Sequence, residues 1–255
     1  TRAIATVFML HHVRPEHPSP FEPNRILKVT PQFLEEVIRQ VRNDGFEIIS
    51  PVEAHFRMIE GDYGSPFVCF TFDDGYRDNL EYAYPIFKRH NLPFAIYVPT
   101  DYADGRGDLW WLALEKVIDR VKALSVKIDG AQRRLRCGTA SEKDATFDTI
   151  YWWLRGIDEA SARAFVRDLC RDADFDQDGL CPELTMNWDE IRHLAADPIV
   201  TIGAHTRRHY ALAGLRIEAR AQAASLFSSG PRPPPAGTLQ RRWIRGEPAS
   251  RGTAA

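Results

Sequence analysis

Phe67–Phe72 is a strand-length segment whose apolar residues do not alternate with polar ones. A strand with this pattern is buried on both faces, as in a parallel sheet covered by helices. Parallel strands are joined by long crossover connections, which are commonly helices. The segment therefore predicts a parallel sheet whose strands alternate with helices.

Other parts of the chain follow the same alternation. Thr30 and Pro31 are a favourable N-cap and first helical residue, and the helix that they open is expected to stop at Gly45. A second, shorter helix is expected around residues 82–90. Apolar runs predict further strands at residues 4–10, 46–49, 94–98 and 199–202. We therefore predict an α/β fold with a parallel sheet, either open or closed into a barrel.

The part of the chain that precedes the last strand is predicted to be mostly helical. Asn187 and Glu190 form the pattern of a capping box, which would open a helix that ends near residue 196. Three longer helices are expected at residues 110–124, 144–155 and 158–173. We interpret residues 110–185 as a helical insertion within one domain that spans residues 1–215.

The composition changes after about residue 215. Residues 228–255 are rich in Arg, Pro, Gly, Ser and Ala and contain few apolar side chains. Such a segment buries too little apolar surface to offset the entropy of ordering, roughly 1–2 kcal/mol per residue. We therefore expect residues 216–255 to be a disordered or aberrant tail, and any barrel to be incomplete at the C-terminus.

Two adjacent carboxylates follow the strand at 67–72 directly. Asp73 and Asp74 stand at its carboxyl end, where parallel α/β sheets build their sites. Their mutual repulsion is costly unless a cation or a shared proton relieves it. Gly75 permits a tight turn that would aim them together. This segment by itself is equally consistent with an ordinary Asp-Asp-Gly turn.

Two histidines follow the strand at 199–202. His205 and His209 are four residues apart, so they face the same side if this segment takes a helical turn. That spacing suits two imidazole ligands of one metal ion. Together with one of the two carboxylates they make three protein ligands, which is the pattern of a catalytic rather than a structural metal site. The remaining carboxylate could accept a proton from water.

A third candidate lies at the end of the first strand. His11 and His12 would reach the same edge of a parallel sheet as Asp73 and His205. A histidine in that place could act as a general acid. A solvent-exposed histidine at a strand end explains the pair equally well.

Several other patterns point away from function. The run Asp174–Gly179 resembles the start of a calcium loop, but Thr185 stands where the bidentate glutamate should be. The pairs Trp110-Trp111 and Trp152-Trp153 fit helix packing better than a sugar platform, although a tryptophan at a cleft could stack on a pyranose. The four cysteines form no C-x-x-C pair. A formal net charge of −2 gives no reason to expect a nucleic-acid partner.

These motifs resemble those of the polysaccharide deacetylases, the family-4 carbohydrate esterases that include the chitooligosaccharide deacetylases. The family's T-F-D-D-G motif is intact at residues 71–75, and its H-[S/T]-x-x-H motif is intact at residues 205–209. The resemblance covers roughly residues 4–215. It implies a distorted (β/α) barrel, a divalent metal that is commonly zinc, and a carbohydrate substrate.

The resemblance also implies a role for each residue. Asp73 would be the general base, and Asp74, His205 and His209 would hold the metal. Leu10-His11-His12-Val13 matches a strand end that carries the general-acid histidine in part of the family, which makes His11 the candidate acid. The implied reaction is hydrolysis of N-acetyl groups on oligo- or polysaccharides that contain N-acetylglucosamine.

The chain departs from the family pattern after the second motif. Residues 210–255 contain no Tyr-Pro-Tyr or Arg-x-Pro-Tyr segment and no late Leu-x-His motif. The alternative hypothesis is therefore a truncated, weakly active or inactive protein of this type that binds metal or glycan. A phosphatase that uses Asp73 or Asp74 as nucleophile is disfavoured, because such enzymes usually separate their two aspartates by one residue.

No segment of the sequence approaches the roughly 20 apolar residues of a membrane span. The short apolar run at residues 4–10 leads straight into two histidines and fits a strand better than a signal peptide. We therefore expect no transmembrane segment and a cytoplasmic location, or the cell envelope if an upstream signal is missing. The oligomeric state is left open by the sequence.

Overall fold

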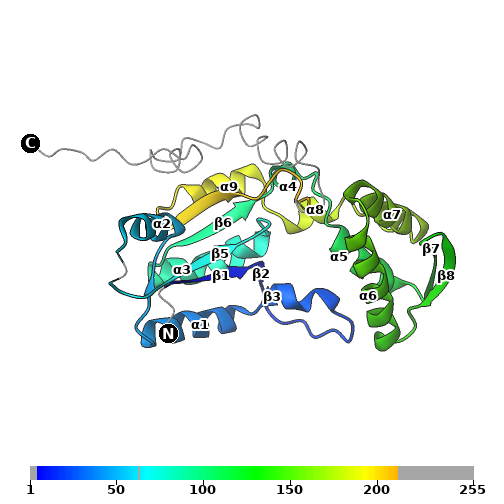
Figure 1. Cartoon of the computed structure of the whole chain (residues 1–255), viewed down its shortest axis with the longest axis horizontal. Helices are drawn as coiled ribbons and strands as arrows, with labels where there is room; N and C mark the ends of the chain where they lie inside the picture. Colours follow the sequence, from blue (N-terminus) through cyan, green and yellow to red (C-terminus); the bar gives the residue numbers. More distant parts are fainter. Residues whose placement is uncertain (1–4, 63, 212–255) are drawn as a thin grey trace, which may run out of the picture.

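The computed structural model of the chain describes residues 5–62 and 64–211. These residues form a parallel sheet in which β1 (Ala5–Leu10), β5 (Phe67–Phe72), β6 (Phe94–Val98) and β9 (Val200–Ala204) lie in that order (Figure 1). The short strand β4 (Glu47–Ile48) pairs with the first residues of β5. Every pairing in this sheet is parallel. The predicted α/β class with a parallel sheet is therefore confirmed.

The central strand β5 is buried along its whole length, as its sequence predicts. Val68, Phe70 and Phe72 belong to the main core, which is covered by α1 (Pro31–Asn43), α3 (Tyr84–His90) and α9 (Trp188–Ala195). Phe67 and Cys69 alternate with them and pack with Ala54 of α2 (Pro51–Glu60) on the opposite face. Burial on both faces explains why the strand is apolar throughout.

The sheet formed by the described residues is open rather than closed into a barrel. Val7 and Met9 of the edge strand β1 are exposed on the face opposite the main core. At the other edge, β9 pairs with β6 and with no other strand of the described residues. The expected tail at 216–255 lies outside the described residues.

The register of the strands brings their carboxyl ends to one edge. Leu10 of β1 lies opposite Phe72 of β5, and Val98 of β6 lies opposite Ala204 of β9. Hydrogen bonds extend this register by one residue, because the Asp73 amide donates to the Leu10 carbonyl (2.9 Å) and the His205 amide to the Val98 carbonyl (3.2 Å). The residues that follow these strands therefore emerge side by side.

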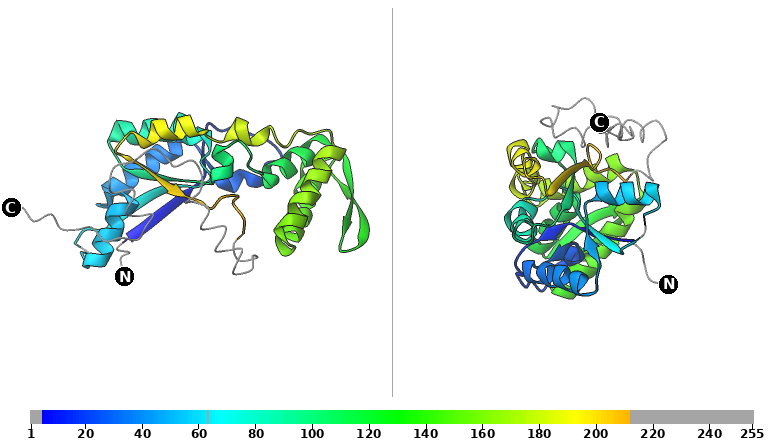
Figure 2. Two further views of the ribbon diagram at one scale, coloured as in Figure 1. Left: turned by 90° about the horizontal axis from the view of Figure 1, so that it is seen from above. Right: turned by 90° about the vertical axis from the view of Figure 1, so that its left-hand side faces the viewer.

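A second group of elements lies beyond that edge. It contains α5 (Trp110–Arg120), α6 (Ala140–Gly156) and α7 (Glu159–Asp172), which share a separate core cluster. Figures 1 and 2 show these helices, in green, as an arm beside the sheet. The short elements complete the fold: β2 (His12–Val13), η1 (Pro23–Leu27), β3 (Lys28–Val29), the π-helix η2 (Asn79–Ala83), α4 (Thr100–Ala103) and α8 (Leu180–Leu184).

The helix caps agree with the sequence. The Thr30 hydroxyl accepts from the Phe33 amide (3.1 Å) at the start of α1, with Pro31 as the first helical residue. Asn187 and Glu190 form the expected capping box of α9. These contacts are local, so short sequence patterns were sufficient to predict them.

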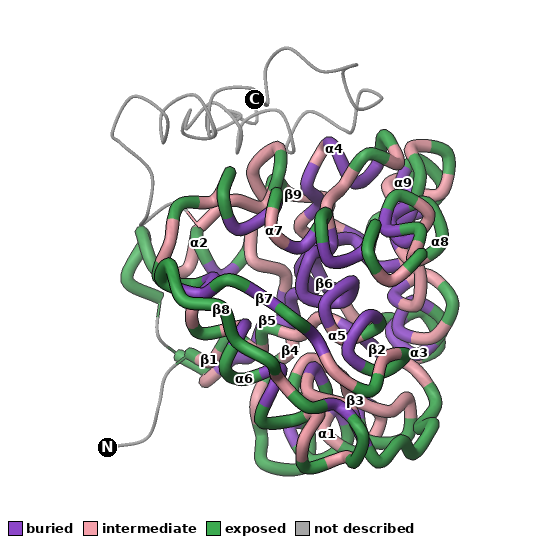
Figure 3. The backbone as a smooth tube through the Cα atoms, turned by 90° about the vertical axis from the view of Figure 1, so that its right-hand side faces the viewer, coloured by how far each residue is buried: buried purple, intermediate pink, exposed green. Residues whose placement is uncertain are grey.

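The insertion is mostly helical, as expected, but the structure differs from the expected elements in one part. After α5 the chain forms an antiparallel hairpin of β7 (Ala123–Ile128) and β8 (Ala131–Arg136), where a helix to residue 124 was expected. Leu124, Val126 and Ile128 pack into the insertion core, whereas β8 is exposed along almost its whole length (Figure 3). The sequence of a polar, exposed strand shows no alternation of apolar and polar residues, so β8 can be recognised only from its pairing with β7.

The helices of the described ranges include none that is both long and apolar enough to cross a bilayer.

The core around β5 gives a test of the fold. Phe72 is fully buried and lies edge-on to Phe87 and Phe94, with ring centroids 5.9 and 5.7 Å away. Phe72→Ala should lower the free energy of unfolding by about 3–5 kcal/mol, through lost burial and the cavity left behind. Phe33→Ala is the matched control, because Phe33 is 56% exposed. Equal losses for both variants in urea titrations would contradict this packing.

Candidate metal site

Asp74 is placed at the edge of the sheet by a strained turn. Asp74 and Gly75 both have left-handed backbone angles, with φ of 70° and 64°. Aspartate tolerates this region, and glycine adopts it freely. A Cβ at Gly75 would also approach the Val98 side chain to 3.1 Å. This turn directs the Asp74 carboxylate into the protein interior, and Asp74 is only 1% exposed.

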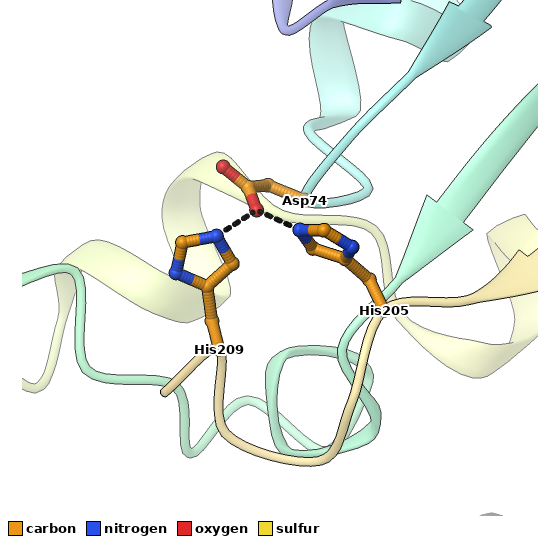
Figure 4. A group of neighbouring side chains, drawn as sticks. All are labelled: Asp74, His205 and His209. Carbon is orange, nitrogen blue, oxygen red and sulfur yellow. Dashed lines mark ion pairs between the residues drawn. The ribbon is translucent and has the colours of Figure 1, made fainter. Parts of the chain in front are cut away.

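The two histidines reach the same place from the segment 205–209, which we call the ligand turn. It is a turn and not the helical segment considered from the sequence. Thr206 and His209 have left-handed φ angles of 62° and 55°, and the Thr206 hydroxyl accepts from the His209 amide (3.0 Å). Both imidazoles point at Asp74 as a result (Figure 4).

The three side chains form a compact cluster. Asp74 Oδ1 lies 3.2 Å from His209 Nε2 and 3.7 Å from His205 Nε2. One ligand atom from each residue lies within 4.8 Å of the others, and within the described ranges this is the one such group of three. The Asp174–Gly179 run contributes to no such group. Its Asp176 carboxylate instead accepts hydrogen bonds from the backbone amides of Asp178 and Gly179.

The donor atoms suit a divalent cation. Asp74 Oδ1 is buried and makes no hydrogen bond within the described structure. A buried carboxylate oxygen without a partner is costly, and a cation would satisfy it. One carboxylate and two imidazole nitrogens are a ligand set that zinc takes, with a position left for water or substrate. The residues present therefore fit the metal that the motifs imply.

Burial sets the protonation states of the cluster. Burial raises the pKa of Asp74 to about 6, although His11 and His205 act to lower it. Burial, reinforced by Arg163, lowers the pKa of His209 to about 4. Burial also lowers the pKa of His205, which the Asp73 carboxylate opposes. At neutral pH the imidazoles are therefore neutral and Asp74 is mainly ionised, which are the forms that bind metal.

The cluster opens into a cavity of about 410 Å³. His11 lines it from the end of β1, and the opposite wall comes from the insertion. Trp110 and Tyr151 stack there at 5.5 Å between ring centroids, and Trp111 lies 5.3 Å from the His209 ring. The tryptophans of α5 are packed, as expected, but they also face the cavity.

The structure separates the two histidines after β1. His11 lines the cavity, whereas His12 is 1% exposed and turned away from it. The His12 Nδ1 atom lies 2.7 Å from an Asp78 carboxylate oxygen, and its ring stacks on Tyr76 at 3.6 Å. His12 therefore has a packing role that its sequence position did not reveal.

Asp73 lies next to the cluster but not on the cavity wall. The residue is 8% exposed and is absent from the side chains that line the 410 Å³ cavity. Its carboxylate is close enough to raise the pKa of His205 against the effect of burial. Its assignment as general base stays a prediction.

No sequence pattern indicated that Asn24 or Tyr151 lies at the cavity, and for Trp110 and Trp111 helix packing was favoured over contact with a sugar. Asn24 lines the cavity, and its side-chain amide donates to the Trp111 carbonyl (3.2 Å) and to a Glu115 carboxylate oxygen (2.6 Å). Tyr151 carries no local motif. Only the packing of the insertion against the end of the sheet brings these residues to the metal cluster.

Part of the chain matches a known family. The sequence profile described as polysaccharide deacetylase matches residues 60–128. YxkH of Bacillus subtilis (strain 168), a protein named provisionally as a polysaccharide deacetylase, is 30% identical over 73 residues, which cover 28% of this chain and 26% of YxkH. The match thus spans about a quarter of the relative's length. The profile includes the motif at 71–75 but stops before the ligand turn.

Distant likenesses to solved structures were also found. The Streptococcus pyogenes deacetylase PplD in complex with acetate is 12% identical at a TM-score of 0.48, covering 88% of this chain and 67% of PplD. IcaB from Ammonifex degensii is 16% identical at a TM-score of 0.42, with coverage of 95% and 70%. A de-N-acetylase from Aggregatibacter actinomycetemcomitans is 15% identical at 0.41, with coverage of 79% and 54%.

The raised pKa of Asp74 predicts how the metal-free protein responds to pH. An unfolded aspartate titrates near ~3.9, so the folded state holds this proton more tightly. The stabilising contribution is fully present below about pH 4 and is lost as the pH rises through about 6. A shift of about two pKa units corresponds to roughly 3 kcal/mol.

Asp74→Asn should remove this pH dependence. With a chelator present, the variant should exceed the parent protein in free energy of unfolding by roughly 2–3 kcal/mol at about pH 8, and by much less at about pH 4. Denaturant titrations at both pH values measure the difference. A difference that does not change with pH would contradict the raised pKa.

Proposed function

We propose that this chain, whose resemblance to the polysaccharide deacetylases is confirmed by the matching profile, is a metal-dependent N-deacetylase of carbohydrate. Its substrate would be an oligo- or polysaccharide that contains N-acetylglucosamine. The observation that carries the proposal is the buried Asp74 oxygen, which faces two imidazole nitrogens at the wall of a cavity. We assign the catalytic unit to residues 1–215, with the insertion as its substrate-facing wall.

The metal would be held by Asp74, His205 and His209. Zinc fits this mixed set of one carboxylate and two imidazoles. A divalent cation here would polarise the acetyl carbonyl and make the attacking water more acidic. The low pKa of His209 supports this role, because an imidazole that stays neutral can ligate over a wide pH range.

Two further residues would move protons. Asp73 adjoins the ligand Asp74 and would accept a proton from the attacking water as its oxygen bonds to the acetyl carbon. His11 lines the same cavity and would donate a proton to the sugar nitrogen as the carbon–nitrogen bond breaks. The products are acetate and a free amino sugar, so atoms and charges balance.

The insertion would bind the sugar. A pyranose has an apolar face that packs well on aromatic rings, and Trp110 and Tyr151 supply such a surface across from the histidines. Arg155 and Glu159 line the same cavity and could bond to hydroxyl groups. The cavity volume of about 410 Å³ lies in the range of small-molecule sites.

A non-catalytic protein that binds metal or glycan is the alternative. It is favoured by the position of Asp73, which does not line the cavity into which the ligands point. Release of acetate from N-acetylglucosamine oligomers separates the two functions.

The histidine ligands give the first test of the proposed site. A variant with both His205→Ala and His209→Ala should lose stoichiometric zinc after gel filtration, because only one of three ligands remains. His193→Ala is the control, since His193 lies in α9 and packs on Tyr84, away from the cluster. Retention of one zinc per chain by the double variant would refute the site.

Asp73→Asn tests the proposed general base. The variant should keep its zinc, because Asp74 supplies the ligand oxygen, and it should release acetate at least ~100-fold more slowly. Metal content and acetate should be measured on the same preparation. An active variant, or one that loses its metal, would reverse the roles given to the two aspartates.

A further inference from the structure

The ligand turn is held in a conformation that it would not adopt alone. Thr206 and His209 both have left-handed backbone angles, and a β-branched residue such as Thr is rarely found there. Such a backbone persists only where the surrounding structure over-determines it. The bond between the Thr206 hydroxyl and the His209 amide lies within the turn and cannot orient it toward Asp74. Another part of the protein must fix that orientation.

Asp101 makes the contacts that do so. It lies in α4, directly after β6, and is 6% exposed. One carboxylate oxygen accepts from Nε of Arg207 (2.8 Å), and the other accepts from Nε of Arg208 (3.0 Å). These arginines are the two residues that precede His209 in the ligand turn. Each bond is charge-assisted, and the two together fix the direction of both side chains.

The main chain of the same segment adds two further bonds. The Asp101 amide donates to the Arg207 carbonyl (3.0 Å), and the Thr100 amide donates to the Thr206 carbonyl (3.4 Å). Three successive residues of the ligand turn are therefore tied to two successive residues of α4. Because α4 follows β6, this ties the turn to the end of a central strand of the sheet.

We propose that Asp101 is a positioning residue for the metal site, acting through Arg207 and Arg208 to hold His205 and His209 toward Asp74. The inference rests on the proposed function, because it concerns the ligands of the proposed metal. Residues that orient metal ligands contribute strongly to affinity without touching the ion. Asp101 has no motif of its own and could be recognised only from its contacts.

A purely structural role predicts that replacing Asp101 lowers the free energy of unfolding of the metal-free protein and leaves its zinc affinity nearly unchanged. Arg207 and Arg208 are 37% and 52% exposed as side chains, so water can solvate both guanidinium groups if the carboxylate is lost. Because the two guanidinium groups stay hydrated, loss of the Asp101 charge leaves no unpaired buried charge behind, and the free energy of unfolding should change little. The positioning role instead predicts a large loss of metal affinity with a small change in the unfolding of the metal-free protein.

The test compares Asp101 of α4 with Asp104, the C-cap residue of the same helix. Asp101→Asn keeps the main-chain bonds and the side-chain volume, but one amide oxygen cannot serve both arginines. Its zinc dissociation constant, measured by chelator competition, should rise about 10- to 100-fold. The visible spectrum of the cobalt-substituted protein should change with it. Asp104→Asn is the control, because Asp104 bonds to Arg106 and to the Trp188 indole and not to the ligand turn.

The arginines provide a second route to the same answer. Arg207→Gln and Arg208→Gln should each weaken zinc binding, and Asp101→Asn should add no further loss when both arginines are already replaced. If Asp101→Asn does not fold, the two arginine variants decide the matter. Zinc affinities equal to that of the Asp104→Asn control would overturn the positioning role alone. Failure of the parent chain to bind zinc would overturn the proposed metal site itself.

Discussion

The parallel register of the sheet places the residues of the candidate site next to one another. β1 and β5 end opposite each other, and β6 and β9 end opposite each other two residues further along, so the residues after each strand emerge at one edge. His11, Asp74, Thr100 and His205 are more than 190 residues apart at their extremes, yet they follow neighbouring strands. A one-residue slip would turn alternate side chains to the opposite face and disperse the cluster.

The same edge concentrates groups that are unfavourable on their own. Asp74 is a buried carboxylate with a raised pKa, and the ligand turn has two residues in left-handed conformations. Natural sequences tolerate such local conflicts mainly at functional sites. A cation would bind the ionised carboxylate and the two neutral imidazoles at once, which would offset the cost of burying them. Trp110, Trp111 and Tyr151 of the insertion line the cavity beside this charge, and electrostatic interactions are stronger in such apolar surroundings than in water.

The sequence was informative wherever the physical signal is local. The strands at 67–72 and 94–98, the caps at Thr30 and Asn187, and the three side chains that the structure brings together around Asp74 all stand in patterns that span a few positions. Contacts between segments that are distant in the sequence could not be predicted in this way. The exposed strand β8 has no apolar period, and Tyr151 faces the cluster only because α6 packs beside α5. Asp101 belongs to the site through Arg207 and Arg208, more than a hundred residues later.

The proposed chemistry requires that Asp74, His205 and His209 bind one divalent cation together. Crystals of the zinc-loaded protein can be measured by anomalous diffraction on either side of the zinc absorption edge. We expect one strong peak at about 2.0–2.2 Å from Asp74 Oδ1 and from both histidine Nε2 atoms. The Asp74 carboxylate and the two imidazoles should keep their present orientation. Zinc bound elsewhere, or a loaded crystal in which either histidine turns away from Asp74, would contradict it.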